Sequence, residues 1–388
     1  MEIRIVEKHE RDLANYLGSM AFVHGRRRAP WTEDPNEPEH VIYGLWDERG
    51  YQAQVVILSF ASIMGPSVVL PMGGIAGVAC MPAARGRGYV RMLMIRALEH
   101  MKEAGQCIST LFPFSYEFYR QLGWEWIGIE RRYGVASQAL KRSEHTDRCR
   151  HADESDRAGM IEAYTNYSRR YRGMLDRDAK LWSKLLDGSA ERHAYTFVYD
   201  GESGIEGYVT FVGGSDECID IDEFIALHPS ARQGLLGLLR RMNMQTRRFA
   251  WSGPEDDGLW MDLCHHALET KIAPVTQGRV VDVGAALGQW TPAAGAEGSF
   301  SLRIRDAIAP WNEAPLRVEF GAGSAAVRAW GEEPDLEMDI QTFSQAYYGS
   351  PSIDLLVAND RLTVRRPEAL HAFREFLSGP LMWMNDHF

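Results

Sequence analysis

Residues 77–91 carry the strongest structural signal of the chain: Gly77-Val78-Ala79-Cys80-Met81-Pro82-Ala83-Ala84-Arg85-Gly86-Arg87-Gly88-Tyr89-Val90-Arg91. Residues 75–81 form a short apolar run that is typical of a buried strand. Pro82 ends this run, because proline cannot donate to a sheet ladder. After Gly88, apolar residues recur at helical spacing as far as Met101. The segment therefore predicts a strand, a tight turn and the start of a helix.

The predicted turn is suited to binding an anion. A helix N-terminus presents unpaired N–H groups and the positive end of the helix dipole. Gly86 and Gly88 carry no side chains that would keep a ligand away from these groups, and Arg85 and Arg87 add positive charge. Such a turn can hold a pyrophosphate. The alternative interpretation is an ordinary strand-to-helix turn with two solvated arginines.

The order Val-x-Cys-x-Pro-x-x-Arg-x-x-Gly, from Val78 to Gly88, resembles the acyl-CoA-binding motif of the GNAT acetyltransferase superfamily. The resemblance implies that the turn holds the pyrophosphate of acetyl-CoA, the acetyl donor. The donor contacts that it implies are Val78, Ala79, Cys80, Arg85, Gly86, Arg87, Gly88, Tyr89, Val90, Arg91, Phe114 and Ser115. A dinucleotide-binding Gly-x-Gly-x-x-Gly near the chain start and a Walker loop are both absent from the sequence.

Bulk properties exclude several classes of partner. A length of 388 residues suggests two or three domains. The formal net charge of -11 argues against binding to nucleic acid, which requires a basic face. With no apolar run long enough for a membrane and no signal peptide, we expect a cytoplasmic protein without a membrane partner. The five scattered cysteines fit a reducing compartment.

A metal site is not predicted. The run Cys264-His265-His266 offers metal-binding side chains. Adjacent residues in a helix point apart, however, and no second pair of ligands is evident in the sequence.

The first 135 residues predict one αβ unit. The expected strands cover residues 41–47, 52–62, 75–81, 108–112 and 124–135, and the expected helices cover 12–22, 114–121 and the segment after Gly88. The polar segment 137–149 is the best candidate for a linker.

Residues 223–236 repeat the order of the first motif: strand, Pro-x-x-Arg-x-Gly, helix. This copy is one residue shorter, lacks the second arginine and has Gln233 where the first copy has Gly86. It has fewer groups for an anion, so we expect a degenerate second GNAT-like fold with a structural role. Its further strands are expected at residues 194–199 and 207–212.

From about Gly284 the pattern changes to the short strands of a meander, at residues 299–304, 316–320, 325–330 and 336–340. A helix at 340–348, a strand at 361–364 and a terminal helix at 367–377 follow. The segment 339–345 resembles the start of a helix in the sterol-carrier-like fold, in which a sheet and helices enclose an apolar tunnel. The alternative is a generic α+β cap without a ligand.

The whole order resembles the Eis (enhanced intracellular survival) family of acetyltransferases. The predicted fold is α+β: tandem GNAT-like mixed αβ domains at residues 1–136 and 150–284, followed by a sterol-carrier-like α+β domain at 285–388. The resemblance implies acetyl transfer from acetyl-CoA to a primary amine, such as an aminoglycoside, a polyamine or a lysine-like group. It also implies a hexamer.

The resemblance implies a role for individual residues. In the family, the tyrosine that starts Tyr-x-x-x-Gly-aromatic protonates the departing thiolate, and Tyr119 occupies that position. The family's general base is the C-terminal carboxylate, here that of Phe388, and the apolar residues 381–384 favour a docked chain end. Trp31 would form an aromatic wall for the acceptor, and Asp386 could hold its cationic amine.

Two other functions remain open at this point. One is a lipid carrier or ligand sensor whose GNAT-like units are only scaffolds; the retained Arg85, Gly86, Arg87 and Gly88 argue against it. The other is acyl transfer to protein lysines. The acceptor itself is open, because the run Arg26-Arg27-Arg28 is basic where a polyamine site would be acidic.

Overall fold

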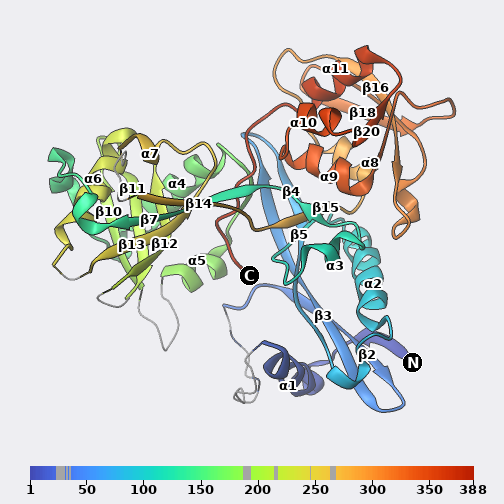
Figure 1. Ribbon diagram of the computed structural model, residues 1–388, viewed down its shortest axis with the longest axis horizontal. Coiled ribbons are helices and arrows are strands. Elements are labelled where there is room, and N and C mark those ends of the chain that lie inside the picture. Colours follow the sequence, from blue (N-terminus) through green and yellow to red (C-terminus); the bar gives the residue numbers. More distant parts are fainter. Residues whose placement is uncertain are drawn as a thin grey trace.

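The computed structural model describes residues 1–22, 31, 34, 36–186, 194–213, 217–244, 246–262 and 268–388. Arg26-Arg27-Arg28 and Cys264-His265-His266 lie outside the described residues. The described residues form three sheets with helices packed on each (Figure 1). We refer to the three sheets with their helices as the first, second and third units, in chain order.

The first unit is built on a mostly antiparallel sheet with the order β1-β2-β3-β4-β5-β15-β6, and β9 pairs with β3. Its strands are β1 (Glu2–Ile5), β2 (His40–Asp47), β3 (Gly50–Met64), β4 (Val69–Cys80), β5 (Ile108–Leu111), β6 (Glu125–Trp126), β9 (Arg172–Leu175) and β15 (Gln277–Val280). Its helices are α1 (Arg11–Phe22), α2 (Tyr89–Glu103) and α3 (Tyr116–Arg120). One face of α2 is buried, from Leu93 to Met101, at the helical spacing expected from the sequence.

The prediction for residues 124–135 is wrong in one respect. Only β6 closes the first sheet, whereas β7 (Ile129–Ala136) enters the second sheet. The place next to β5 is taken by β15, which pairs with β5 on one side and with β6 on the other. The Gln277 amide of β15 also donates to the carbonyls of Tyr116 and Trp124. The backbone pairing with β15 satisfies the edge of β5, which the two residues of β6 could not cover.

The second unit has a sheet with the order β14-β7-β13-β12-β11-β10-β8. Besides β7, its strands are β8 (Cys149–His151), β10 (Ala194–Asp200), β11 (Ile205–Val212), β12 (Ile219–Ala226), β13 (Arg248–Gly253) and β14 (Leu268–Pro274). Its helices are α4 (Arg157–Ser168), α5 (Ala179–Leu186), α6 (Pro229–Arg241) and α7 (Leu259–Asp262). The predicted linker 137–149 is part of this unit: Ser137 and Thr146 are buried, and the Ser137 hydroxyl donates to the Thr246 carbonyl.

The third unit has a sheet with the order β18-β17-β16-β19-β20. Its strands are β16 (Gly298–Arg305), β17 (Leu316–Gly321), β18 (Ser324–Ala329), β19 (Leu336–Asp339) and β20 (Leu362–Val364). The sheet is not a pure meander, because β16 and β19 run parallel. Its helices are α8 (Val283–Gly288), α9 (Ile340–Tyr348), α10 (Ile353–Ala358) and α11 (Pro367–Phe376).

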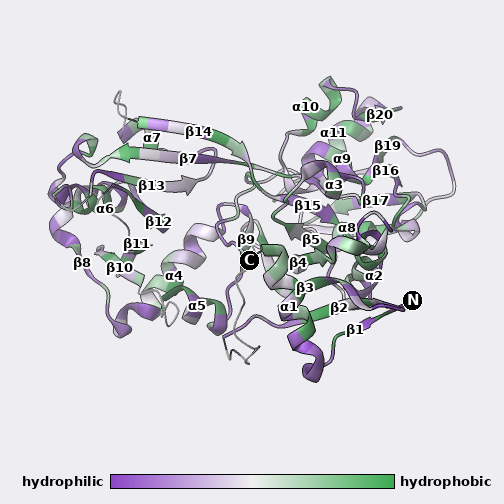
Figure 2. Ribbon diagram, turned by 60° about the horizontal axis from the view of Figure 1, so that its bottom comes forward, coloured by the Kyte–Doolittle hydropathy of each residue, from purple (hydrophilic) through white to green (hydrophobic). Residues whose placement is uncertain are grey.

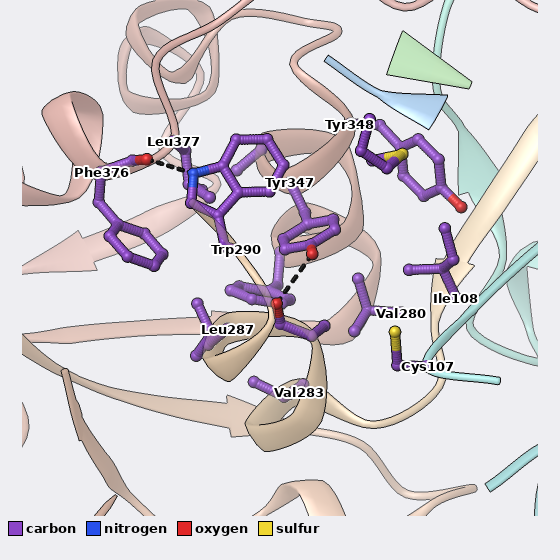
Figure 3. Packing of buried hydrophobic residues seen from close by; sticks show 14 of the residues in the cluster. Cys107, Ile108, Val280, Val283, Leu287, Trp290, Tyr347, Tyr348, Phe376 and Leu377 are labelled. Carbon is purple, nitrogen blue, oxygen red and sulfur yellow. Dashed lines mark hydrogen bonds between the residues drawn. The ribbon is translucent and has the colours of Figure 1, made fainter. Parts of the chain in front are cut away.

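Aromatic rings fill the interior of the third unit. The ring of Phe300 lies 5.3 Å from that of Phe373 and 5.5 Å from that of Phe376. Figure 3 shows Trp290 and Tyr347 packed together, each held by a hydrogen bond to a backbone carbonyl. These side chains are part of the buried core of the third unit.

The last segment of the chain, residues 380–388, leaves the third unit and ends between the other two (Figure 1). We call this segment the tail. The tail forms a parallel bridge with β9: Arg172 N–H donates to Leu381 O over 2.9 Å, and Trp383 N–H donates to Arg172 O over 2.8 Å. In Figure 2 the chain end lies beside β9. The tail is therefore docked rather than frayed, as its apolar residues predict.

Candidate functional site

A gap opens in the first sheet where β4 and β5 diverge. The two parallel strands pair only from Met72/Ile108 to Ile75/Leu111, although β4 continues to Cys80. Against β3, the register of β4 shifts beyond Ala76, and Gly77 has a φ of +56°. This bulge favours glycine and turns the backbone of β4 into the gap.

The predicted anion turn lies at the open end of this gap. Gly86 and Gly88 have φ values of +78° and +80°, in the left-handed region that favours glycine, and α2 begins directly after them. Asp47 steadies the turn: its carboxylate accepts from the Tyr89 hydroxyl over 2.9 Å and lies 3.7 Å from Arg87.

A cavity of about 640 Å³ extends from this turn along β4. We call it the turn cavity. All the predicted donor contacts line it except Arg87 and Ser115. Arg87 faces Asp47, and the Ser115 hydroxyl accepts from Phe118 N–H as the cap of α3. Burial raises the pKa of the Cys80 thiol, which therefore stays protonated and unreactive at neutral pH.

A second cavity, of about 420 Å³, adjoins the turn cavity. We call it the inner cavity. Trp31, Tyr119 and Phe388 line it, and so the structure brings together the predicted wall, acid and base. The two cavities share Phe22, Val78 and Phe114 in their linings, so they are neighbours at that point.

Tyr119 is 4% exposed, and its ring packs edge-on against Phe114 and Phe118. Burial raises the pKa of its hydroxyl above the usual value, because desolvation disfavours the phenolate. At neutral pH the hydroxyl is protonated and can donate a proton.

Phe388 is held by aromatic packing at the far side of the inner cavity. Its ring lies 4.9 Å from that of Phe60 and 5.4 Å from that of Phe112. A Cβ added at Gly74 would lie 2.7 Å from the Phe388 ring, so glycine at this position makes room for it. The packing fixes the last residue of the chain against β3, β4 and the end of β5.

Asp386 requires a correction, because its carboxylate is already engaged. It accepts from Arg177 Nε over 2.7 Å and from the Tyr164 hydroxyl over 3.2 Å, and it does not line the inner cavity. Burial raises the pKa of this carboxyl group, and the adjacent guanidinium opposes that shift. Asp386 therefore binds the tail to the second unit rather than an acceptor amine.

Sequence reasoning missed Arg177 and Glu223, which meet Asp386 in the structure. The one available signal was Glu223 itself, a charged residue at a position of the repeated motif where the first copy has Ala76. Charges rarely occupy buried strand positions without a partner.

Two further findings concern metals and membranes. Among the described residues, no group of three or more His, Cys, Asp or Glu side chains is placed to hold a metal ion. Within the same residues, no helix is long and apolar enough to cross a membrane.

Comparison with known families assigns all three units. Residues 2–127 match the model of an acetyltransferase (GNAT) domain, and residues 173–280 match a second model with the same description. Residues 283–385 match a sterol carrier protein domain. The domain boundaries at 136, 150 and 284 stay predictions. β7 pairs in the second sheet, whereas β9 and β15 pair in the first, so the sheets are not divided at these positions.

Similar proteins span nearly the whole chain. An uncharacterized N-acetyltransferase of Streptomyces avermitilis is 25% identical over 375 residues, 88% of each chain. A GCN5-related N-acetyltransferase from Anabaena variabilis has a TM-score of 0.87 at 19% identity, with 100% of each chain covered. Eis1 from Mycobacterium abscessus has a TM-score of 0.81 at 20% identity, also with 100% of each covered. These solved structures share the fold.

Proposed function

From the confirmed order of two GNAT acetyltransferase domains and a sterol carrier domain, which makes this chain an acyltransferase, we propose that it transfers acetyl from acetyl-CoA to a primary amine. We further propose that it is a cytoplasmic enzyme of the Eis type. One observation carries the proposal: the turn cavity and the inner cavity are adjacent and share part of their lining, and Tyr119 and Phe388 line the inner one.

The residues of the turn cavity suit acetyl-CoA. Two left-handed glycines and the start of α2 offer backbone N–H groups to a pyrophosphate, and Arg85 adds a charge-assisted bond. The unpaired edge of β4 beyond Ile75 offers backbone groups to the amide-bearing arm of the donor.

The residues of the inner cavity suit the proton transfers. Acetyl-CoA supplies the thioester. The Phe388 carboxylate takes a proton from the acceptor ammonium, which leaves a neutral amine able to attack the carbonyl carbon. The Tyr119 hydroxyl gives its proton to the sulfur as the C–S bond breaks, so that CoA leaves as a thiol. The nitrogen of the new amide loses its surplus proton, which returns to the Tyr119 phenolate.

The acceptor class is best tested with a panel of amines in a thiol-release assay. We expect acetyl-CoA-dependent turnover with at least one free primary amine. Turnover only with a folded protein would favour acyl transfer to lysine side chains. A melting temperature raised by a long-chain lipid but not by acetyl-CoA would contradict the proposal and favour a lipid carrier.

Gly88→Val should raise the KM for acetyl-CoA by about 10- to 100-fold, the value of one charge-assisted hydrogen bond. A branched side chain is strained at a φ of +80° and would displace the turn from the pyrophosphate. Gly105→Val is the matched control, because Gly105 has a φ of +73° beyond the other end of α2, again with open space around it. An unchanged KM in Gly88→Val would remove the pyrophosphate assignment.

We also expect a homohexamer, in accordance with the resemblance to the Eis family. Large exposed apolar side chains are available for interfaces, among them Tyr16 and Ile272. Light scattering at micromolar concentration should give six times the mass of the chain, and a monomeric mass would contradict the expectation.

A further inference from the structure

The second unit contains a gap of the same kind as the one that opens the site of the first. Its parallel strands β12 and β13 pair only at Ile219/Phe249 and Asp220/Ala250 and then diverge. At this place the first unit forms the turn cavity. The cavity at this place in the second unit has a volume of only about 200 Å³, and Trp383 and Asn385 of the tail form part of its wall.

In the second unit, the turn that corresponds to the anion turn has its arginine paired with a carboxylate of the same chain. Arg232 occupies the place of Arg85 in the repeated motif. Its Nε donates to Asp262 over 2.5 Å, and the Gln233 amide donates to the same carboxylate. Because the charge of Arg232 is balanced by Asp262, the second copy has less positive charge available to bind a phosphate than the first copy has.

A buried ion cluster joins this gap to the tail. Arg177 is 3% exposed, and its two terminal nitrogens donate to the Glu223 carboxylate over 2.6 and 3.0 Å. The same guanidinium donates through Nε to Asp386, and Asn385 donates to Glu223 over 2.6 Å. The Tyr208 hydroxyl also donates to Glu223, at 2.6 Å. Two consecutive side chains of the tail are thereby bonded to the second unit.

This cluster holds the tail in one arrangement. Release of Asp386 would break a charge-assisted hydrogen bond to a buried guanidinium, although Arg177 would keep its pair with Glu223. The bidentate contact with Glu223 fixes the plane of the Arg177 fork, and with it the direction of Nε. Asp386 is only two residues from Phe388, so this contact acts on the end of the chain together with the packing of the Phe388 ring against Phe60 and Phe112.

We propose that Arg177 is a positioning residue, which holds the tail through Asp386 so that the carboxylate of Phe388 stays in the inner cavity. In this arrangement the gap of the second unit receives the tail of the chain, whereas the gap of the first unit receives the acetyl donor. The inference rests on the proposed function, in which Phe388 supplies the general base.

Asp386→Ala tests the inference with little risk to folding, because Arg177 keeps its pair with Glu223. We expect kcat to fall by about 10- to 100-fold, the value of a hydrogen bond to a charged group. The KM for acetyl-CoA should stay within about twofold, because the turn cavity is untouched. Asp386→Asn keeps an oxygen that can accept from Nε and should recover much of the activity. Arg177→Lys, a single point charge in place of a fork, should recover less.

A second measurement is independent of activity. Carboxypeptidase A removes C-terminal aromatic residues, so it should release Phe388 several times faster from Asp386→Ala than from the wild type. Arg150→Met is the matched control, because Arg150 also bonds two carboxylates of the second unit, those of Asp156 and Asp200, without touching the tail. It should change neither kcat nor the rate of release.

The outcomes separate this inference from the function on which it rests. Full activity and slow release in Asp386→Ala would overturn the positioning role. Fast release with full activity would overturn it as well, and would also contradict Phe388 as the base. A fall in kcat that Arg150→Met shares would assign the effect to general loss of stability and overturn the inference.

Discussion

Adding a single residue after Phe388 should abolish acetyl transfer while leaving the fold and the binding of acetyl-CoA intact. One more residue moves the terminal carboxylate by up to about 3.5 Å. The Phe388 ring cannot follow, because it is fixed against Phe60 and Phe112 and over Gly74. Loss of a positioned base lowers kcat by about 10²–10⁴-fold.

Three variants make this result specific to the carboxylate. Deletion of Phe388 should be as damaging as the extension, whereas Phe388→Leu keeps the carboxylate in place and should retain much of the activity. A residue added before Met1 should have no effect on kcat. Met1 is largely exposed and precedes β1, an edge strand of the first sheet. Full turnover by the extended chain, measured as thiol release, would leave the enzyme without an assigned base.

Tyr119→Phe should lower kcat by about 10²–10⁴-fold, because the ring keeps its packing but has no proton for the departing sulfur. The KM for acetyl-CoA should be nearly unchanged, since the hydroxyl acts on the leaving group and not on the bound pyrophosphate. Because burial raises the pKa of Tyr119, loss of activity by ionisation of this group is expected only above the usual range of a tyrosine.

The neighbouring Tyr116→Phe is the control for that variant. Tyr116 lies on the same short helix, but its hydroxyl donates to the Pro274 carbonyl and not into the inner cavity. Its removal should leave kcat within about twofold, in line with the small net value of one partly exposed hydrogen bond. If Tyr119→Phe behaves in the same way, the acid is another group.

Local patterns carried most of what the sequence could predict. The strand, turn and helix around Gly88 follow from residues that are adjacent in the chain, and so do the strands of the third unit with α9 and α11, whereas α8 and α10 were not predicted. The exchange of β7 and β15 could not be predicted in this way. Both strands carry charged or polar residues among apolar ones. Which sheet they join depends on edges that form only in the folded protein.

The same limit applies to the site. Tyr119 and Phe388 could be named from a motif and a resemblance, each at a single position. The cluster that holds the tail could not, because Arg177 lies 46 residues from Glu223 and 209 from Asp386. No spacing rule connects positions so far apart, and a buried arginine looks the same in a sequence as a solvated one.

The position of β15 bears on how the protein is made. Until residues 277–280 have left the ribosome, the nascent chain carries a catalytic sheet whose β5 edge is open and whose β6 has no neighbour. Open edges of this kind invite pairing with other chains until the second unit has been synthesised. A shorter chain that ends with the first GNAT match, at residue 127, would lack β15 and would leave this edge uncovered. The shortest chain in which the β5 edge is covered therefore includes the second unit, whatever that unit does chemically.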